Sequence, residues 1–114
     1  MELLLKRIYD AADGKDGVRI LVDRLWPRGV SKERAKLDLW LKEVAPSAEL
    51  RLWFGHDPEK WLEFRRRYRK ELEDREEELE QIRAAVKRGR VTLLYGAKDA
   101  KHNQAVVLKE YLEG

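Results

Sequence analysis

The sequence contains no cysteine, which excludes disulfide bonds, thiol catalysis and cysteine-ligated zinc. It has only two histidines, His56 and His102, and neither has a ligand partner at helical spacing, so we expect no metal site. Long hydrophobic runs are also missing. No apolar stretch approaches the roughly 20 residues that a membrane-spanning helix needs, and the first residues show no signal-peptide cleavage site. These absences predict a cytoplasmic protein with no membrane partner and no cofactor.

A large excess of charge of one sign is missing as well. Charged residues make up 41% of the 114 residues, yet the formal net charge is only +3. This balance makes nucleic acid an unlikely general partner, because proteins that bind the phosphate backbone usually carry a strong basic excess. Hydrophobic residues make up 43%, which predicts one folded domain over residues 1–114. Many Lys, Arg and Glu with few Asn, Gln or Met indicate a thermophilic source.

Residues 91–112, VTLLYGAKDAKHNQAVVLKEYL, are the most informative segment. Residues 91–94 form a short apolar run typical of a buried strand, which Tyr95 and Gly96 end. A small polar loop follows, and the apolar spacing from about residue 101 predicts a helix. A strand, a glycine loop and a helix start together aim free backbone N–H groups at an anion. We therefore expect the chemistry of the protein to gather here.

The N-terminal half contains two further predicted strands, residues 3–9 and 18–25. The connection between them is about nine residues, shorter than the usual dozen or so of a parallel crossover, so its length favours an antiparallel pair. Ser31 is a predicted N-cap for a short helix that ends near Lys36, and residues 39–40 begin a second helical segment. Ser47 and Gly55 bound a third helix at residues 48–54.

Asp57 and Pro58 predict the start of a long helix, because Asp is a good N-cap and Pro fits the first helical position. Its apolar stripe runs to Val86 and is interrupted only at Arg75. Unbroken, the helix would be about 45 Å long, against about 17 Å for a five-residue strand, so we expect a break near residues 73–75. The whole pattern predicts a small single α/β domain, with a three- or four-stranded, mostly parallel sheet flanked by helices.

Three segments together resemble a known family. They are LVDRLWPRG at residues 21–29, APS at 45–47 with Leu50 and Arg51, and LLYGAKD at 93–99 with His102 and Asn103. This combination is similar to the YeaO-like family of small bacterial and archaeal proteins, a branch of domain of unknown function 488. The resemblance implies a cytosolic α/β domain and carries no established activity. Longer relatives in the wider group have a Cys-His-Arg stretch where this chain has residues 101–103, Lys-His-Asn, so any thiol chemistry of those relatives does not transfer.

Parallel pairing of the strands at 18–25 and 91–94 would bring their carboxyl ends to one edge of the sheet, where ligands bind in such folds. The cationic side chains there would hold a phosphate or carboxylate, and Asp23 or His102 would move a proton. We therefore predict a small-anion site, with enzyme activity on a small metabolite as one option. The catalytic candidates are Asp23 and His102, and the ligand-binding candidates are Arg24, Trp26, Arg28, Tyr95, Gly96, Lys98 and Asn103.

Structural explanations of the same residues stay open. Asp23 can pair with an arginine in a buried ion pair, Lys98 and Asp99 can be ordinary loop charges, and Trp26 can pack in the core. Two other functions also stay open. One is a nucleic-acid-binding or regulatory module that uses Trp26, Arg28 and the basic helix face at residues 65–69. The other is a scaffold whose long helix forms a homodimer.

Overall fold

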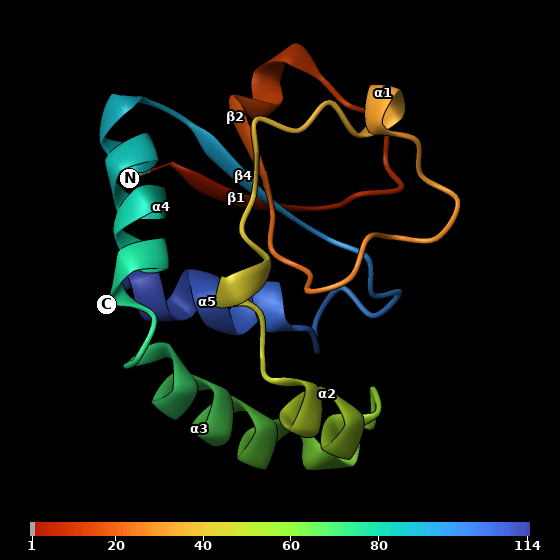
Figure 1. Cartoon of the computed structure of the whole chain (residues 1–114), viewed down its shortest axis with the longest axis vertical. Coiled ribbons are helices and arrows are strands. Elements are labelled where there is room, and N and C mark those ends of the chain that lie inside the picture. The colour runs from red at the N-terminus through yellow and green to blue at the C-terminus, as the bar shows by residue number, and fades with distance from the viewer. Residues whose placement is uncertain (1) are drawn as a thin grey trace.

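The computed structural model describes residues 2–114, which form a four-stranded sheet covered mainly on one face by helices (Figure 1). The strands are β1 (Leu3–Arg7), β2 (Val18–Leu21), β3 (Leu39–Trp40) and β4 (Val91–Tyr95). Their order is β1-β4-β2-β3 and every pair is parallel, which confirms the predicted α/β class. All of β4 is buried, since it has a neighbour on each side and packing on both faces.

Five α-helices connect and cover the strands: α1 (Lys32–Ala35), α2 (Ala48–Phe54), α3 (Trp61–Leu72), α4 (Glu76–Arg88) and α5 (Gln104–Glu113). Short 3-10 helices occupy Gly14–Asp16, Lys42–Val44 and Pro58–Lys60. In Figure 1, α5 lies between the sheet and α3, and it contacts β1, β4 and α3. The main core therefore fills the space between one sheet face and the helices α3, α4 and α5, with Tyr68, Phe64 and Leu93 among its fully or nearly fully buried side chains.

Local signals place several helix boundaries correctly. The Ser47 side chain accepts a hydrogen bond from the Leu50 N–H, and Gly55 ends α2 in the left-handed conformation, as predicted. The long helix is broken where expected, since α3 ends at Leu72 and α4 begins at Glu76. Asp57 caps a 3-10 turn that leads into α3.

Two predictions about the strands are wrong. Residues 39–40 were expected to begin a helix, but they form β3, which pairs with β2 through Ile20 and Leu21. β1 and β2 do not form an antiparallel pair, because β4 lies between them and is parallel to both. Because β1 and β2 are not neighbours in the sheet, the short connection between them needs no crossover helix. It spans β4 with a loop and one 3-10 turn instead.

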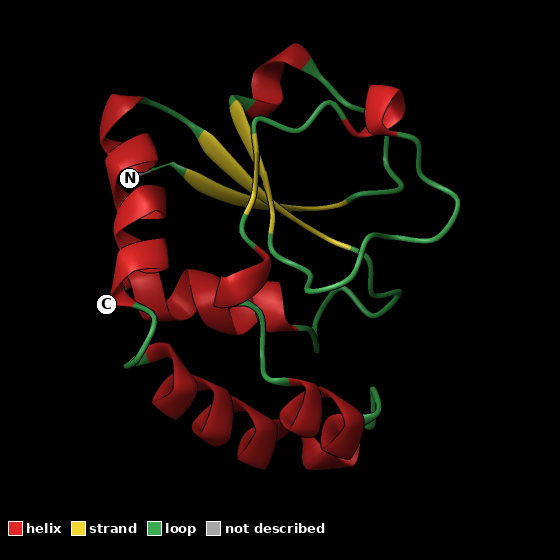
Figure 2. Cartoon of the chain, in the orientation of Figure 1, coloured by secondary structure: helices red, strands yellow, loops and turns green. Residues whose placement is uncertain are grey.

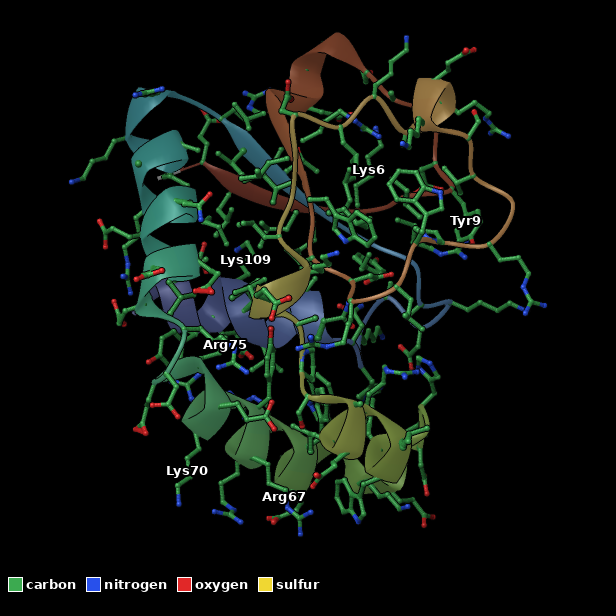
Figure 3. All side chains as sticks on the ribbon, in the orientation of Figure 1. Lys6, Tyr9, Arg67, Lys70, Arg75 and Lys109 are labelled. Atoms are coloured by element: carbon green, nitrogen blue, oxygen red, sulfur yellow. The ribbon has the colours of Figure 1, made fainter. Side chains whose placement is uncertain are left out.

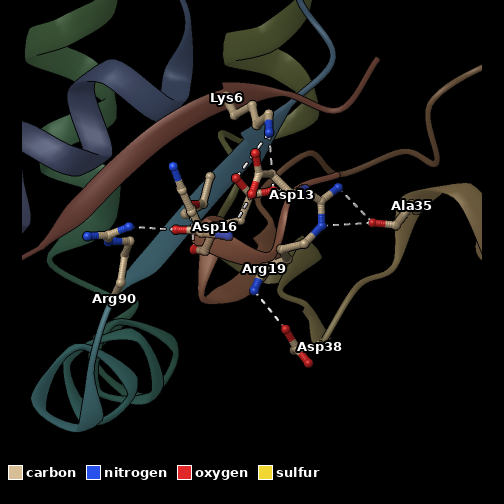
Figure 4. A network of polar contacts seen from close by, with 9 residues as sticks. Lys6, Asp13, Asp16, Arg19, Ala35, Asp38 and Arg90 are labelled. Carbon is tan, nitrogen blue, oxygen red and sulfur yellow. Dashed lines mark hydrogen bonds and ion pairs between the residues drawn. The ribbon is translucent and has the colours of Figure 1, made fainter. Parts of the chain in front are cut away.

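The second face of the sheet carries a buried ionic network in place of a helical layer (Figure 4). The Asp16 carboxylate accepts hydrogen bonds from the Lys6 ammonium at 3.0 Å and from the Arg19 guanidinium. Arg19 is 4% exposed, and it also donates to the Ala35 carbonyl oxygen through Nε and Nη2 at 3.0 and 2.8 Å. Thr92 donates its hydroxyl to the main-chain oxygen of Asp16 at 2.7 Å. These contacts fix the β1–β2 connection and α1 against the sheet.

Burial alone would raise the pKa of Asp16, but the hydrogen bonds from the Asp13 N–H, Lys6 and Arg19 outweigh it, so this pKa lies below the ordinary 3.8. Asp16 is therefore fully charged at neutral pH and matched by two cations. Within residues 2–114, no helix is both long enough and apolar enough to cross a membrane.

Candidate functional site

A pocket of about 280 Å³ lies at the carboxyl edge of the sheet, beyond the ends of β2 and β4. Parallel strands end at the same edge, so the loops that follow β2 and β4 leave the sheet on the same side (Figure 2). Helices α2 and α3 and the start of α5 complete its wall. The lining combines aromatic rings and prolines with a few polar groups: Tyr9, Asp23, Arg24, Leu25, Trp26, Pro27, Ala45, Pro46, Arg51, Phe54, His56, Phe64, Gly96, Ala97, Asn103 and Gln104.

A larger hollow of about 560 Å³ lies between α2 and α3, but its chemistry favours the smaller pocket as the ligand site. Its lining is mostly charged side chains, and two of them, Arg66 and Arg67, already pair with Glu63. Figure 3 shows Arg67 and Lys70 pointing from α3 away from the sheet. Ligand sites are typically apolar with a small number of converging polar groups, which describes the pocket at the sheet edge.

Asp23 is the carboxylate of this pocket. It follows the buried Val22, the first residue after β2, and it accepts hydrogen bonds from the Gly96 N–H at 2.9 Å and from the Gln104 side-chain amide. A Cβ on Gly96 would lie 2.8 Å from Asp23 Oδ2, so only glycine lets this backbone approach the carboxylate. Burial raises the pKa of Asp23 to about 6, and the two hydrogen bonds and nearby His56 offset only part of that effect.

Arg24 holds the wall of the pocket in place. Its Nε donates to the Pro46 carbonyl oxygen and its Nη2 to the Ala45 carbonyl oxygen, both at 3.1 Å. Its Nη1 lies 3.8 Å from the exposed Glu43 carboxylate. Asp23 is thus not paired with Arg24, and no ion pair to Asp23 forms anywhere in residues 2–114. The buried arginine–aspartate pair that the sequence suggested for Asp23 exists, but at Asp16 and Arg19.

Two further side chains with N–H donors, neither of them among the predicted site residues, reach the mouth of the pocket. Arg51 lies on α2, and His56 follows the glycine that ends this helix. Both side chains are exposed, and neither makes a hydrogen bond or ion pair with another described residue. His56 has a φ of 58°, one of only two positive values among the non-glycine residues described. Such a conformation is uncommon outside glycine and is frequent at functional sites.

Sequence signals for these two residues were present but weak. Arg51 belongs to the Leu50-Arg51 pair that supports the family resemblance. The sequence suggests no role for His56 other than that of a metal ligand, and residues 2–114 contain no cluster of three or more His, Asp or Glu that could hold a metal ion. Gln104 and Tyr9 were also missed, since each needs the packing of α5 or β1 to reach the pocket.

At the start of α5, where the sequence predicts an anion site, several N–H groups already have partners within the chain. The Asp99 carboxylate accepts hydrogen bonds from the N–H groups of Lys101 and His102 at 2.9 and 3.1 Å, and from His102 Nδ1 at 2.8 Å. The Asn103 side chain accepts from the Val106 N–H at 3.1 Å. Backbone hydrogen bonds from Lys101, followed by the His102 contacts, lower the pKa of Asp99. The N–H groups of Lys101 and His102 before α5, and that of Val106 in its first turn, are therefore occupied by the chain's own side chains.

The predicted site residues divide into two groups. Five of them line the pocket: Asp23, Arg24, Trp26, Gly96 and Asn103. The other four do not: Arg28 and Lys98 are exposed, Tyr95 is buried in the core, and the His102 ring packs edge-on against Trp61 with centroids 5.2 Å apart. Trp26 has a structural role as well, because its indole N–H donates to the Val30 carbonyl oxygen at 2.7 Å.

Comparisons with known proteins support the family resemblance. Residues 2–114 match the family described as "Inactive DUF488-N3 subclade". The chain is 45% identical over 112 residues to "Uncharacterized protein YeaO" of Escherichia coli (strain K12), which covers 98% of this chain and 97% of that one. It is 41% identical over 108 residues to "Uncharacterized protein Rv3073c" of Mycobacterium tuberculosis (strain ATCC 25618 / H37Rv), with 95% and 91% covered. No solved structure matches significantly. With a family match over nearly its whole length, the chain belongs to the YeaO-like branch of the DUF488 family.

Proposed function

We propose that this protein is a small-molecule-binding domain whose pocket at the sheet edge holds an organic ligand through a carboxylate or phosphate group. The observation that carries the proposal is the pair of unused donors at the pocket mouth. Arg51 and His56 line the pocket and make no hydrogen bond to another described residue. A guanidinium has five N–H donors in a planar fork that fits carboxylate and phosphate, so Arg51 is suited to bind such a group.

The aromatic lining supports an organic ligand rather than a bare ion. Tyr9, Trp26, Phe54 and Phe64 give the pocket apolar surface that inorganic phosphate cannot use. The start of α5, where the sequence predicts the anion, is less suitable, because Asp99 accepts from the N–H groups of Lys101 and His102 just before the helix and places a negative charge there. The anion site is therefore proposed at the mouth of the pocket, at Arg51 and His56.

Binding without turnover is the preferred form of the proposal. The matching family is described as inactive, which favours a domain that has kept a pocket and not a reaction. One observation favours the enzyme alternative. The pKa of Asp23, at about 6, is close to neutrality and suits proton transfer, and His56 lines the same pocket. In that alternative the acid–base pair is Asp23 with His56 in place of His102.

The nucleic-acid and scaffold alternatives have less support. Arg66 and Arg67 pair with Glu63, and Arg65 pairs with Glu110, so the basic run on α3 has few charges left for a phosphate backbone. The apolar stripe of α3 and α4 packs into the protein's own core, although Leu62 is 74% exposed. Both alternatives remain predictions that a mobility-shift titration and a measurement of oligomeric state would test.

Amide NMR titration with a simple aromatic carboxylate, phenylpropionate, tests the main proposal. We expect the amides of Gly96, Gln104 and His56 to shift at millimolar phenylpropionate. Arg51→Gln should weaken binding about tenfold or more, since it removes a charge-assisted hydrogen bond. The matched control is Arg83→Gln, which removes an arginine that pairs only with Glu76 and Glu80 on the surface of α4.

Two results would contradict the proposal. One is the absence of any shift around the pocket with either phenylpropionate or phenyl phosphate at millimolar concentration. The other is equal affinity in Arg51→Gln and the Arg83→Gln control, which would place the ligand elsewhere on the surface.

A further inference from the structure

We propose that the ligand of this pocket also carries an amine, and that its ammonium group pairs with the Asp23 carboxylate. The ligand would then be a small amino acid or amino phosphate, held at its anionic end by Arg51 and at its cationic end by Asp23. The anionic half of this inference rests on the proposed function, whereas the cationic half rests on Asp23 and the aromatic rings that line the same pocket.

Asp23 is a carboxylate with no cation to match it. A carboxylate can accept about four hydrogen bonds, and Asp23 accepts only two from the chain, from the Gly96 N–H and the Gln104 amide. Among the described residues no lysine or arginine lies within ion-pair distance of it, and its neighbour Arg24 donates to the Ala45 and Pro46 carbonyl oxygens instead. An ammonium from the ligand would supply the missing charge and the missing donors.

The aromatic side chains of the pocket favour the same group. Tyr9, Trp26, Phe54 and Phe64 all line the pocket. The faces of aromatic rings attract cations, and aromatic cages are a known means of binding organic ammonium groups. A ligand that was only anionic would place its charge in the same pocket as Asp23 and would be repelled. An amine at the Asp23 end removes this conflict and lets Arg51 bind the acid.

The pKa of Asp23, about 6, agrees with this inference. Burial raises that pKa because the charged form lacks compensation, and at neutral pH the group is nevertheless mostly ionised. The charged and polar groups that face it are Arg24, Arg51 and His56 at the mouth, Gln104 from α5, and the Gly96 N–H. None of these forms an ion pair with it in the structure.

Three matched probes separate the two ends of the ligand: γ-aminobutyrate, butyrate and butylamine, with ε-aminocaproate as a longer amino acid. Each is titrated into wild type, Asp23→Asn, Arg51→Gln and Asp74→Asn by amide NMR. Asp74 is exposed, and its substitution is the control for loss of an aspartate charge. We expect one of the two amino acids to bind at least about tenfold more tightly than butyrate. Asp23→Asn should remove that advantage, and it should also strengthen butyrate binding, because the charge that repels butyrate is gone.

A second measurement does not depend on any variant. The pKa of Asp23, followed by carbon NMR of its carboxyl group in wild type, should fall when an amino acid or butylamine binds, because a nearby cation favours the ionised form. It should rise when butyrate binds, because a nearby anion disfavours that form. A probe that binds elsewhere would leave this pKa unchanged.

The outcomes distinguish this inference from the proposed function. If butyrate binds through Arg51 but neither amino acid binds more tightly, the inference fails and the proposed function stands. If butylamine binds and needs Asp23 while butyrate does not bind, the inference stands and the anion-based function fails. If no probe changes any pocket amide or the pKa of Asp23, both are wrong.

Discussion

Asp23→Asn should make the protein more stable at neutral pH, even though it removes a side chain at the centre of the proposed site. The folded-state pKa of Asp23 is about 6, against an ordinary 3.8, so the folded state binds the proton more tightly than the unfolded chain. This stabilisation is complete below pH 3.8 and is lost as the pH rises through 6. One pKa unit corresponds to about 1.4 kcal/mol, so ionising Asp23 costs the folded protein at most about 3 kcal/mol above pH 6.

Asparagine avoids this cost because it does not ionise, and it can keep both hydrogen bonds of Asp23. Its carbonyl oxygen can accept from the Gly96 N–H. Its amide can donate to the Gln104 side-chain oxygen once the Gln104 amide group flips. The stability of Asp23→Asn relative to wild type should therefore rise by about 2 to 3 kcal/mol between pH 4 and pH 7.5. This change with pH is unaffected by any pH-independent difference in the free energy of unfolding between the two proteins.

Urea unfolding followed by tryptophan fluorescence measures this difference, since the chain has four tryptophans. Unfolding curves of wild type, Asp23→Asn and the exposed control Asp74→Asn are compared at several pH values across this window. The control should follow wild type at every pH. A stability difference between Asp23→Asn and wild type that stays constant with pH would show that Asp23 is well solvated. It would refute the claim that the Asp23 carboxylate lacks a compensating partner.

Three further predictions concern the fold and the support of the site. Asp16→Asn should cost about 3–5 kcal/mol at neutral pH, because it leaves buried Arg19 without its anion; urea unfolding should show this loss shrinking below pH 3.8, where wild-type Asp16 becomes protonated. Gly96→Ala should push the carboxylate of Asp23 away from its N–H donor and raise the pKa of Asp23 further in carbon NMR; an unchanged pKa would contradict the close approach. Asn103→Ala should lower the free energy of unfolding by about 1 kcal/mol through loss of the α5 N-cap, and an unaltered thermal midpoint would show that the cap adds nothing.

The sequence predicts those parts of the fold that local chemistry determines. Ser47 and Gly55 mark the ends of α2 because the capping hydroxyl and the left-handed glycine act on backbone groups a few residues away. The break between α3 and α4 was predictable because Arg75 could not continue a buried stripe. In the structure Arg75 instead donates to the Glu43 carbonyl oxygen at 2.8 Å.

Features that depend on distant partners were not predictable in this way. β3 has only two residues, and its conformation is fixed by pairing with β2 and by the hydrogen bond from the Arg19 N–H to the Asp38 side chain at 2.8 Å. The relation of β1 to β2 depends on β4, which enters the sheet some seventy residues later in the chain. A connection length measured in sequence cannot show that another strand will be inserted.

The residues of the candidate site also divide into those that the sequence indicates and those that only the packing of the helices reveals. Asp23 and Gly96 were found because residues just beyond parallel strands share an edge whatever the helices do. Arg51 and His56 were not selected because the packing of α2 alone brings them to the pocket mouth. The loop at residues 97–103 suggested an anion site from its composition, but composition does not reveal that Asp99 turns back to occupy the N–H groups of that loop.

Asp16 and Asp23 show how the same residue type can serve the fold in one place and a ligand in another. Both residues lie next to strands in the sequence, and both are largely buried. Asp16 has two cations, and its pKa falls below 3.8. Asp23 has none, and its pKa rises to about 6. Removing the charge should therefore destabilise the protein at Asp16 and stabilise it at Asp23. A carboxylate that the fold would be more stable without needs another reason to be there, and a cationic group on a ligand supplies one.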